Sequence, residues 1–325
     1  MRFLIAGAGA IGGYIGAKLA QAGEDVVLYA RGPHLKAMQE RGLRVIGNSE
    51  SENFEVHPRI IGDLTDARDV DVIFLGVKAH GLTALAPHIT PLIRENTTVV
   101  STQNGVPWWF FQFGEQQVQL ERVDPGGVIA KSIDKNHVLG SIAYFATDIV
   151  EPGVIRHNEG NRISLGEPDG SRSDRVRAIA EALVKAGLRA PVTARLRHEI
   201  WVKILGNVAF NPISALTGAT LVEIVHDPDA CALVRRIMEE AEAVAAKLGM
   251  ELPVTIDQRI AGAEKVGSHK TSMLQDRECG RPMEIEAIVG AVAELGERLG
   301  VAMPHTASVY ACVKLLDEIS KRSPK

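Results

Sequence analysis

The chain has 325 residues, of which 46% are apolar and 23% charged, and its formal net charge is −4. At roughly 100–200 residues per domain, this length predicts about two domains with the core of a soluble globular protein. The charge balance excludes a strongly basic nucleic-acid-binding protein, and no apolar run approaches the ~20 residues of a membrane span. We therefore expect neither a nucleic acid nor a membrane among its partners.

The N-terminus and the cysteines both bear on location. The first twenty residues have the Arg and the apolar stretch of a secretory signal, but their glycines fall where a nucleotide-binding turn needs them, and no clear cleavage site follows. Cys231, Cys279 and Cys312 are odd in number and have neither CxxC nor metal-finger spacing. We expect reduced structural thiols, no metal site and a cytoplasmic location.

The first half of the chain alternates strand-like and helix-like segments. Short apolar or β-branched runs predict buried strands, and helical spacing ending at a glycine predicts two helices. This alternation predicts a doubly wound, Rossmann-type parallel sheet. The expected strands are Phe3–Gly7, Val26–Tyr29, Val70–Val77, Thr97–Thr102, Ser141–Ala146, Gly153–His157 and Arg162–Leu165, and the expected helices are Ala10–Ala22 and Asp174–Ala186.

From about Arg195, long helical periodicities replace this alternation. The pattern predicts an α/β domain of residues 1–194 followed by an all-α domain of residues 195–325. Three prolines, Pro253, Pro282 and Pro304, stand where helices can begin. The expected helices are Leu196–Phe210, Pro228–Leu248, Thr255–Val266, Pro282–Leu299 and His305–Ser320.

A GxGxxG motif follows the first strand and opens the first helix. Gly7 permits a tight turn, Gly9 lets the backbone approach a pyrophosphate, and Gly12 lets helix and strand pack closely. The helix start at Ala10 and Ile11 offers free N–H groups to an anion. The motif predicts a dinucleotide site in the first domain; the alternative is a glycine-rich turn without a ligand.

The choice of dinucleotide depends on the end of the second strand. An acidic residue there would bind the ribose 2′-hydroxyl of NAD, but the chain has Arg31 at this place. A guanidinium can bind a 2′-phosphate through two hydrogen bonds, which favours NADP(H). The alternative is a solvated surface arginine.

Two later strands also end in polar residues. Lys78 follows the strand near Val77, and Asn104 follows Thr102. Ligands bind at the carboxyl ends of strands in open α/β sheets, so both are candidates for cofactor binding. Asn104 could contact a nicotinamide or a carbonyl substrate, or it could simply form an Asn-Gly turn.

A polar stripe crosses the otherwise apolar helix that begins near Leu196. Lys203, Asn207 and Asn211 recur every four residues and so share one helix face. An apolar helix should be mostly buried, and a polar group buried without a partner costs ~1–3 kcal/mol. The stripe therefore predicts a functional site; the alternative pairs Lys203 with Glu199 on a solvated edge.

Further polar residues lie in two later segments. Ser272 and Glu284 are candidates for the same site, although locally Ser272 could cap a short helix and Glu284 could favour a helix N-terminus after Pro282.

Over nearly its whole length the chain resembles the 2-dehydropantoate 2-reductases, or ketopantoate reductases. The resemblance rests on the N-terminal GAGAIGGYIGAKLA, on QNGV at 103–106, on WVKILGNVAFNPISALTGATL at 201–221, and on TSMLQDRECGRPMEIEAIVG at 271–290. It implies transfer of a hydride from NADPH to C2 of 2-dehydropantoate, a small 2-oxo acid, which gives pantoate for coenzyme A synthesis.

The resemblance also implies roles for the candidate residues. Lys203 matches the catalytic lysine and Glu284 the active-site glutamate, with Glu284 and Asn104 also at the cofactor. Substrate contacts are implied for Asn104, Asn207, Asn211 and Ser272, and cofactor contacts for Arg31 and Lys78. A lysine ammonium can polarise the carbonyl and protonate the alkoxide that hydride transfer leaves. A homodimer is suggested by the resemblance alone.

The chain departs from the family pattern at two places. Many members have a further substrate asparagine in the region where this chain has Leu216–Thr220, and Thr220 could replace it only approximately. The segment Trp108–Phe113 holds two tryptophans and three phenylalanines. The aromatic segment is either a core or subunit-contact cluster, or a wall beside Asn104 that suits a bulkier 2-oxo acid. Two alternatives to a pantoate-forming enzyme therefore remain: a reductase of another 2-oxo acid, and a non-catalytic NADP(H)-sensing protein.

Overall fold

A computed structural model describes residues 1–113 and 118–322 of the chain. It divides the chain into two compact units. The first contains residues 1–103, 108–119 and 126–196, and the second contains residues 104–107, 120–125 and 197–325. The second unit thus includes two short segments from the first half of the chain. A single boundary in the sequence therefore does not separate the two units.

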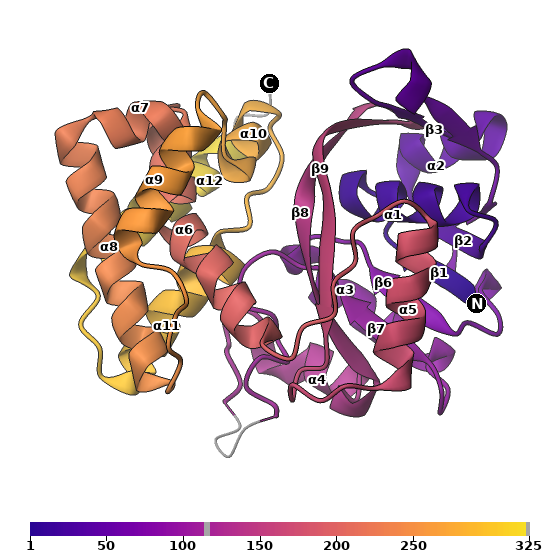
Figure 1. Cartoon of the computed structure of the whole chain (residues 1–325), viewed down its shortest axis with the longest axis horizontal. Coiled ribbons are helices and arrows are strands. Elements are labelled where there is room, and N and C mark those ends of the chain that lie inside the picture. Colours follow the sequence, from indigo (N-terminus) through magenta and orange to yellow (C-terminus); the bar gives the residue numbers. More distant parts are fainter. Residues whose placement is uncertain (114–117, 323–325) are drawn as a thin grey trace. The chain divides into compact units, whose positions relative to one another are not determined.

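A nine-stranded sheet forms the first unit (Figure 1). Its order is β4-β3-β9-β8-β7-β6-β1-β2-β5, and the run from β5 to β8 is parallel throughout. In chain order these six strands have the 3-2-1-4-5-6 arrangement of a dinucleotide-binding sheet. The strands are β1 (Arg2–Ala6), β2 (Asp25–Tyr29), β3 (Leu43–Ile46), β4 (Phe54–Val56), β5 (Arg59–Ile61), β6 (Val72–Leu75), β7 (Thr98–Ser101), β8 (Val138–Glu151) and β9 (Val154–Gly166).

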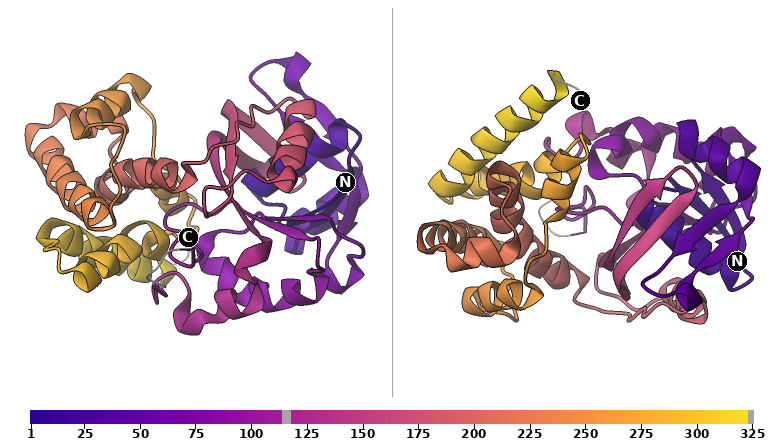
Figure 2. Two further views of the ribbon diagram at one scale, coloured as in Figure 1. Left: turned by 60° about the horizontal axis from the view of Figure 1, so that its bottom comes forward. Right: turned by 90° about the horizontal axis from the view of Figure 1, so that it is seen from above.

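The helices of this unit cover both faces of the sheet (Figure 2). The central strands are therefore buried along their whole length: every residue of β6 and of β7 is buried, and β6 (VIFL) is also apolar throughout. The predicted doubly wound α/β fold is confirmed. The helices are α1 (Ala10–Gln21), α2 (Gly32–Arg41), α3 (Ala79–Ile89), α4 (Val128–Ser132) and α5 (Asp174–Lys185).

The long hairpin of β8 and β9 differs from the sequence prediction. Two separate strands, Gly153–His157 and Arg162–Leu165, were expected there, but β9 runs continuously from Val154 to Gly166. The pairing with β8 is antiparallel, and its register shifts near Tyr144 and Ala146, where a β-bulge bends the hairpin. Strands β3, β4 and β5, of three or four residues each, were not predicted.

The aromatic segment after Pro107 lies in the core of the first unit. Trp108, Trp109, Phe110 and Phe111 are each at most 4% exposed. A Cβ at Gly140 on β8 would lie 2.7 Å from the Trp109 ring, so the indole packs directly on the strand. Of the two interpretations of this segment, the packing favours a core cluster.

The second unit is mainly helical (Figure 1). The Trp201 indole donates to the backbone oxygen of Ala241, 3.2 Å away on α8. Helix α6 was expected to end at Phe210 before Pro212, but it continues to Thr217 with the proline inside. The helices are α6 (Leu196–Thr217), α7 (Leu221–His226), α8 (Pro228–Lys247), α9 (Ile256–Val266), α10 (Ser272–Glu278), α11 (Ala291–Leu299) and α12 (Pro304–Arg322).

A short π-helix, Glu286–Gly290, precedes α11. The sequence predicted one regular helix from Pro282 to Leu299; instead, helical structure begins at Ile285 and passes first through the π-helix.

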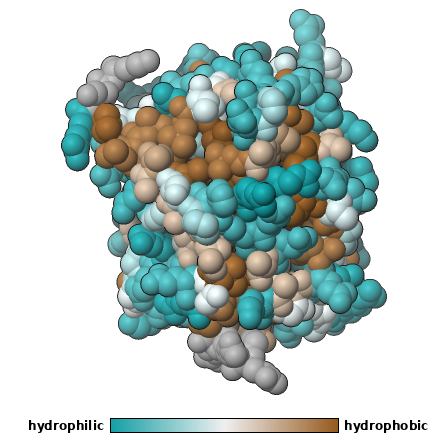
Figure 3. Space-filling model, turned by 90° about the vertical axis from the view of Figure 1, so that its left-hand side faces the viewer, coloured by the Kyte–Doolittle hydropathy of each residue, from teal (hydrophilic) through white to brown (hydrophobic). Residues whose placement is uncertain are grey.

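The surface of the molecule carries some apolar residues, and Figure 3 shows them gathered in the upper half of one face. The large exposed apolar side chains of the second unit include Val266, Leu315 and Ile319. Within the described residues, no helix is both long and apolar enough to cross a membrane. Cys231, Cys279 and Cys312 are free thiols.

Candidate active site

The glycine turn between β1 and α1 is built by close backbone packing. Gly7 has φ of +111°, and a Cβ there would lie 2.6 Å from the Val77 side chain. A Cβ on Gly12 would lie 2.3 Å from the Gly7 oxygen. Both positions therefore exclude any larger residue, because backbone atoms cannot move aside.

Gly9 differs from its two neighbours in the motif. A Cβ at Gly9 would meet its nearest heavy atom at 3.9 Å, so the protein itself does not require a glycine there. Gly9 is the N-cap of α1, has no side-chain cap, and is followed by a first turn without acidic residues. A small N-terminal residue with open space before free N–H groups fits the close approach of a pyrophosphate. The residues present therefore fit a dinucleotide.

Arg31 lies directly after β2 and Ala30, as the N-cap of α2. It is exposed, and its guanidinium lies 5.7 Å from the centre of the Tyr29 ring. A cation over an aromatic face is partly held in place, and the side chain as a whole remains exposed. This places a planar donor at the carboxyl end of β2, where a ribose phosphate of a dinucleotide would lie.

Lys78 follows β6, which pairs with the other edge of β1; it forms the N-cap of α3 and is partly buried. The neighbouring turn is fixed by Gln103, whose side-chain N–H group donates to the backbone oxygens of Leu75 and Val77 at 2.8 and 3.1 Å. The glycine turn, Arg31 and Lys78 thus all follow parallel strands of one sheet.

Lys203 lies on α6 in the second unit and is partly buried. Burial lowers the pKa of Lys203 from 10.5 to about 8, while the negative charge of Glu284 acts in the opposite direction. Glu284 is also partly buried and precedes the π-helix. The two side chains therefore interact electrostatically, and the lysine becomes an acid that is protonated at neutral pH but readily gives up its proton.

The other members of the polar stripe lie further along α6. The Asn207 amide donates to the side-chain oxygen of Asn104 at 3.0 Å. Asn211 is 5% exposed. The second unit thus brings Asn104 into contact with Asn207, two residues that the sequence had identified from distant motifs.

Ser272 is exposed at the start of α10. The sequence left open whether its hydroxyl caps this helix; the cap is Thr271, whose hydroxyl accepts from the Leu274 N–H at 3.3 Å. Arg277 fastens α10 to α6 by donating to the Ala215 oxygen at 2.6 Å. Ser272 is therefore not needed as a cap. Thr220, by contrast, donates its hydroxyl proton to Glu223, so it is engaged in the cap of α7.

Sequence reasoning missed Gly76, which supports the glycine turn. A Cβ there would lie 2.2 Å from the Gly7 oxygen and 3.0 Å from the Gly12 Cα. The available signal was a glycine directly after the buried β6.

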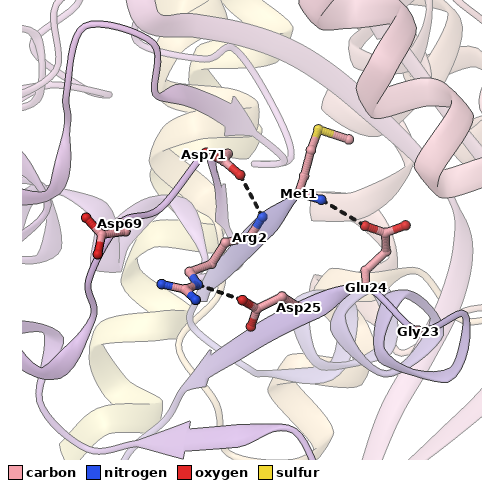
Figure 4. A pocket seen from close by; sticks show the side chains of 7 residues that line it. All are labelled: Met1, Arg2, Gly23, Glu24, Asp25, Asp69 and Asp71. Carbon is pink, nitrogen blue, oxygen red and sulfur yellow. Dashed lines mark hydrogen bonds and ion pairs between the residues drawn. The ribbon is translucent and has the colours of Figure 1, made fainter.

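A polar pocket lies at the opposite, amino ends of β1 and β2 (Figure 4). Its acidic groups are paired: Glu24 with the N-terminal ammonium, Asp25 with the Arg2 side chain, and Asp71 with the Arg2 N–H. Ligands of such sheets bind at the carboxyl ends of the strands, so this pocket is a structural ion-pair network.

The comparisons with known proteins identify the family. Models of the ketopantoate reductase PanE/ApbA family match residues 3–170, and models of its C-terminal region match residues 195–317. A 2-dehydropantoate 2-reductase of Mesorhizobium japonicum is 50% identical over 97% of this chain and 98% of its own length. A solved 2-dehydropantoate 2-reductase of Methylococcus capsulatus is 30% identical, with a TM-score of 0.85 over 100% of this chain and 99% of that chain.

A third relative has a different substrate. D-Mandelate dehydrogenase, solved with NADH and anilino(oxo)acetate, is 25% identical, with a TM-score of 0.84 over 99% of this chain and 100% of that chain. These relatives share one type of activity: each is a nicotinamide-dependent oxidoreductase that acts on a CH–OH group. The chain belongs to the ketopantoate reductase family.

Proposed function

We propose that the protein reduces the 2-oxo group of 2-dehydropantoate with NADPH and that Lys203 supplies the proton. The observation that carries this proposal is a lysine on an apolar helix whose pKa is lowered to about 8 beside Glu284. A general acid works best when its pKa lies near the operating pH. The 50% identity to a 2-dehydropantoate 2-reductase supports the substrate.

The cofactor would be held by the glycine turn of the first unit. Backbone N–H groups of Ala10 and Ile11 would bind the pyrophosphate in front of Gly9, and Arg31 would bind the 2′-phosphate. Lys78 would add a second positive charge. When bound, the nicotinamide supplies the hydride that reduces C2 of the substrate.

The residues of the second unit would handle the substrate and the proton. The Lys203 ammonium would donate a hydrogen bond to the 2-oxo oxygen and transfer its proton as the C2 oxygen becomes an alkoxide. The lysine is then neutral and regains a proton from solvent. Glu284 favours the protonated lysine, while Asn207, Asn211 and Ser272 would bind the substrate carboxylate and hydroxyl by hydrogen bonds.

A second candidate is a reductase of an aromatic 2-oxo acid. The likeness to D-mandelate dehydrogenase favours it, because that protein binds NADH and an aromatic oxo acid on the same scaffold. The cofactor would then be NADH, and Arg31 would have no phosphate to bind.

One experiment separates these candidates. Steady-state kcat/KM would be measured for 2-dehydropantoate, phenylglyoxylate and branched 2-oxo acids, each with NADPH and NADH. A higher kcat/KM for phenylglyoxylate with NADH than for 2-dehydropantoate with NADPH would reject the first proposal. Tight NADPH binding without turnover of any acid would instead identify a sensor.

Lys203→Ala tests the mechanism in the same assay. We expect kcat to fall by roughly 10²–10⁴-fold, the usual contribution of a general acid, while NADPH affinity stays within about twofold. Unchanged turnover would exclude Lys203 as the acid.

A further inference from the structure

The π-helix Glu286–Gly290 lies two residues after Glu284, within the candidate site's own chain segment. A π-turn contains one residue more than an α-turn and is rare, and it occurs frequently at functional sites. Such a turn persists only where surrounding contacts hold it. Two sets of contacts do so here, one on the Glu286 side chain and one on the Ala287 carbonyl.

The Glu286 carboxylate is held by two groups. The Tyr310 hydroxyl lies 2.9 and 2.8 Å from its two oxygens, and the Arg122 guanidinium lies 3.6 Å from it. Burial, followed by the bond to Glu286, raises the pKa of Tyr310 to about 12, so the phenol remains a donor. A Cβ on Gly290 would lie 2.5 Å from this carboxylate. The side chain therefore spans the π-helix from its first residue to its last.

The Ala287 carbonyl holds the turn that carries Asn104. It accepts the Val106 N–H at 2.9 Å. Gly105 has φ of +90°, and a Cβ there would lie 2.3 Å from the Ala287 oxygen. The turn can approach the π-helix this closely only with glycine at 105. Asn104, next in the chain, then accepts the hydrogen bond from Asn207.

We propose that Glu286 and Tyr310 are positioning residues for Asn104, acting through the Ala287 carbonyl. If the π-turn became a regular α-turn, which holds one residue fewer, one side of the helix would rotate relative to the other by about 100°. The Ala287 carbonyl would then point in another direction. The hydrogen bond from the Val106 N–H to the Ala287 oxygen would break, and the hydrogen bond between Asn207 and Asn104 would be lost. The effect on catalysis rests on the proposed function, in which Asn104 contacts substrate and cofactor.

A double-mutant cycle tests this coupling. Tyr310→Phe keeps the ring beneath Arg122, 5.5 Å from the guanidinium, and removes only the hydroxyl. We expect it to lower kcat/KM roughly tenfold in the wild-type background, as a small misplacement does, and less than twofold in the Asn104→Ala background. Equal fold losses in both backgrounds would overturn the proposal, because a merely structural effect does not depend on Asn104.

Hydrogen exchange of the Val106 amide supplies a readout that needs no activity. We expect strong protection in the wild type, faster exchange in Tyr310→Phe and Glu286→Ala, and a smaller change in Glu286→Gln, which keeps an acceptor for the phenol. Unchanged Val106 protection in Tyr310→Phe and Glu286→Ala would reject the positioning role even if turnover changed. If no 2-oxo acid is turned over, the proposed function fails. The exchange rate of the Val106 amide still tests whether Glu286 and Tyr310 position the turn that carries Asn104.

Glu264→Gln is the matched control. It removes a carboxylate from an exposed pair with His226 in the same unit, 2.9 Å apart. We expect no change in Val106 exchange or in kcat/KM. Melting temperatures of all variants establish that each is folded at the assay temperature.

Discussion

Asn207 donates its side-chain N–H to the side-chain oxygen of Asn104 over 3.0 Å, joining two residues that are 103 positions apart. This bond fixes the orientation of the Asn104 amide, since its oxygen is engaged as an acceptor and its N–H₂ group points the other way. An amide held in this orientation is suited to donate to a carbonyl oxygen of a nicotinamide or a substrate.

Removing this partner should misorient Asn104. We expect Asn207→Ala to lower kcat/KM for the preferred 2-oxo acid by at least about tenfold, because it removes the hydrogen bond to Asn104 together with the proposed substrate contact of Asn207. Asn158→Ala is the control, because it also removes an amide donor, to Asp148 at 2.7 Å, but on β9 of the other unit. A loss of the same size in both variants would show that the effect is one of general stability.

The pKa of Lys203 predicts the pH dependence of the reaction. Burial lowers it to about 8, and only the protonated ammonium can act as the acid, so kcat/KM should be constant below pH 7 and fall as the pH rises through about 8. Glu284 raises this pKa, so Glu284→Gln should move the alkaline limb to lower pH. A pH–rate profile for both enzymes checks this. A limb that stayed in place in the variant would contradict the electrostatic link between Glu284 and Lys203.

The sequence predicted the parts of the site that depend on local spacing. The glycine turn has a fixed spacing between strand and helix, and Lys203 and Asn207 share a helix face because they are four residues apart. The Asn104–Asn207 bond and the π-helix could not be predicted in this way. Both depend on contacts between segments far apart in the chain, such as Glu286 with Tyr310.

The fold shows the same limit. Strand β6 was predictable because both of its faces are buried, which makes it apolar throughout. Strands β3 and β5 are too short to show a period. Each also pairs with a strand that is not its neighbour in the sequence: β3 with β9, and β5 with β2. Pro212 suggested the end of α6, but tertiary packing overrides this local signal, since the proline and its neighbours are buried.

Arg31 should decide between the two nicotinamide cofactors. If its guanidinium binds the 2′-phosphate, Arg31→Ala should weaken NADPH binding by roughly ten- to a hundredfold, the range for a charge-assisted hydrogen bond, with little effect on NADH. Fluorescence titration with each cofactor measures both constants. Arg41→Ala, which removes an arginine at the other end of α2, serves as the control. Equal losses for NADPH and NADH would show that Arg31 does not distinguish them.

Glu240 should stabilise the helical unit through its charge. It is 9% exposed on α8 and accepts hydrogen bonds from the N-terminal turn of α12: from the His305 N–H at 3.0 Å, and from the Thr306 N–H and hydroxyl at 2.9 and 2.6 Å. Burial alone would raise the pKa of Glu240, but these bonds together lower it. The ionised form is therefore favoured in the folded protein, and its contribution is lost as the pH falls through the lowered pKa.

Glu240→Gln should accordingly reduce the free energy of unfolding by about 1–3 kcal/mol at pH 7, because one amide oxygen cannot replace two charged acceptors. The difference from the wild type should shrink at an acid pH below the lowered pKa of Glu240, where protonation of this carboxylate removes the same bonds. Urea unfolding at both pH values measures this. Glu223→Gln, a change in an exposed helix cap, is the control and should alter stability little. If the Glu240 difference were the same at both pH values, packing of the side chain rather than its charge would hold α12 to α8.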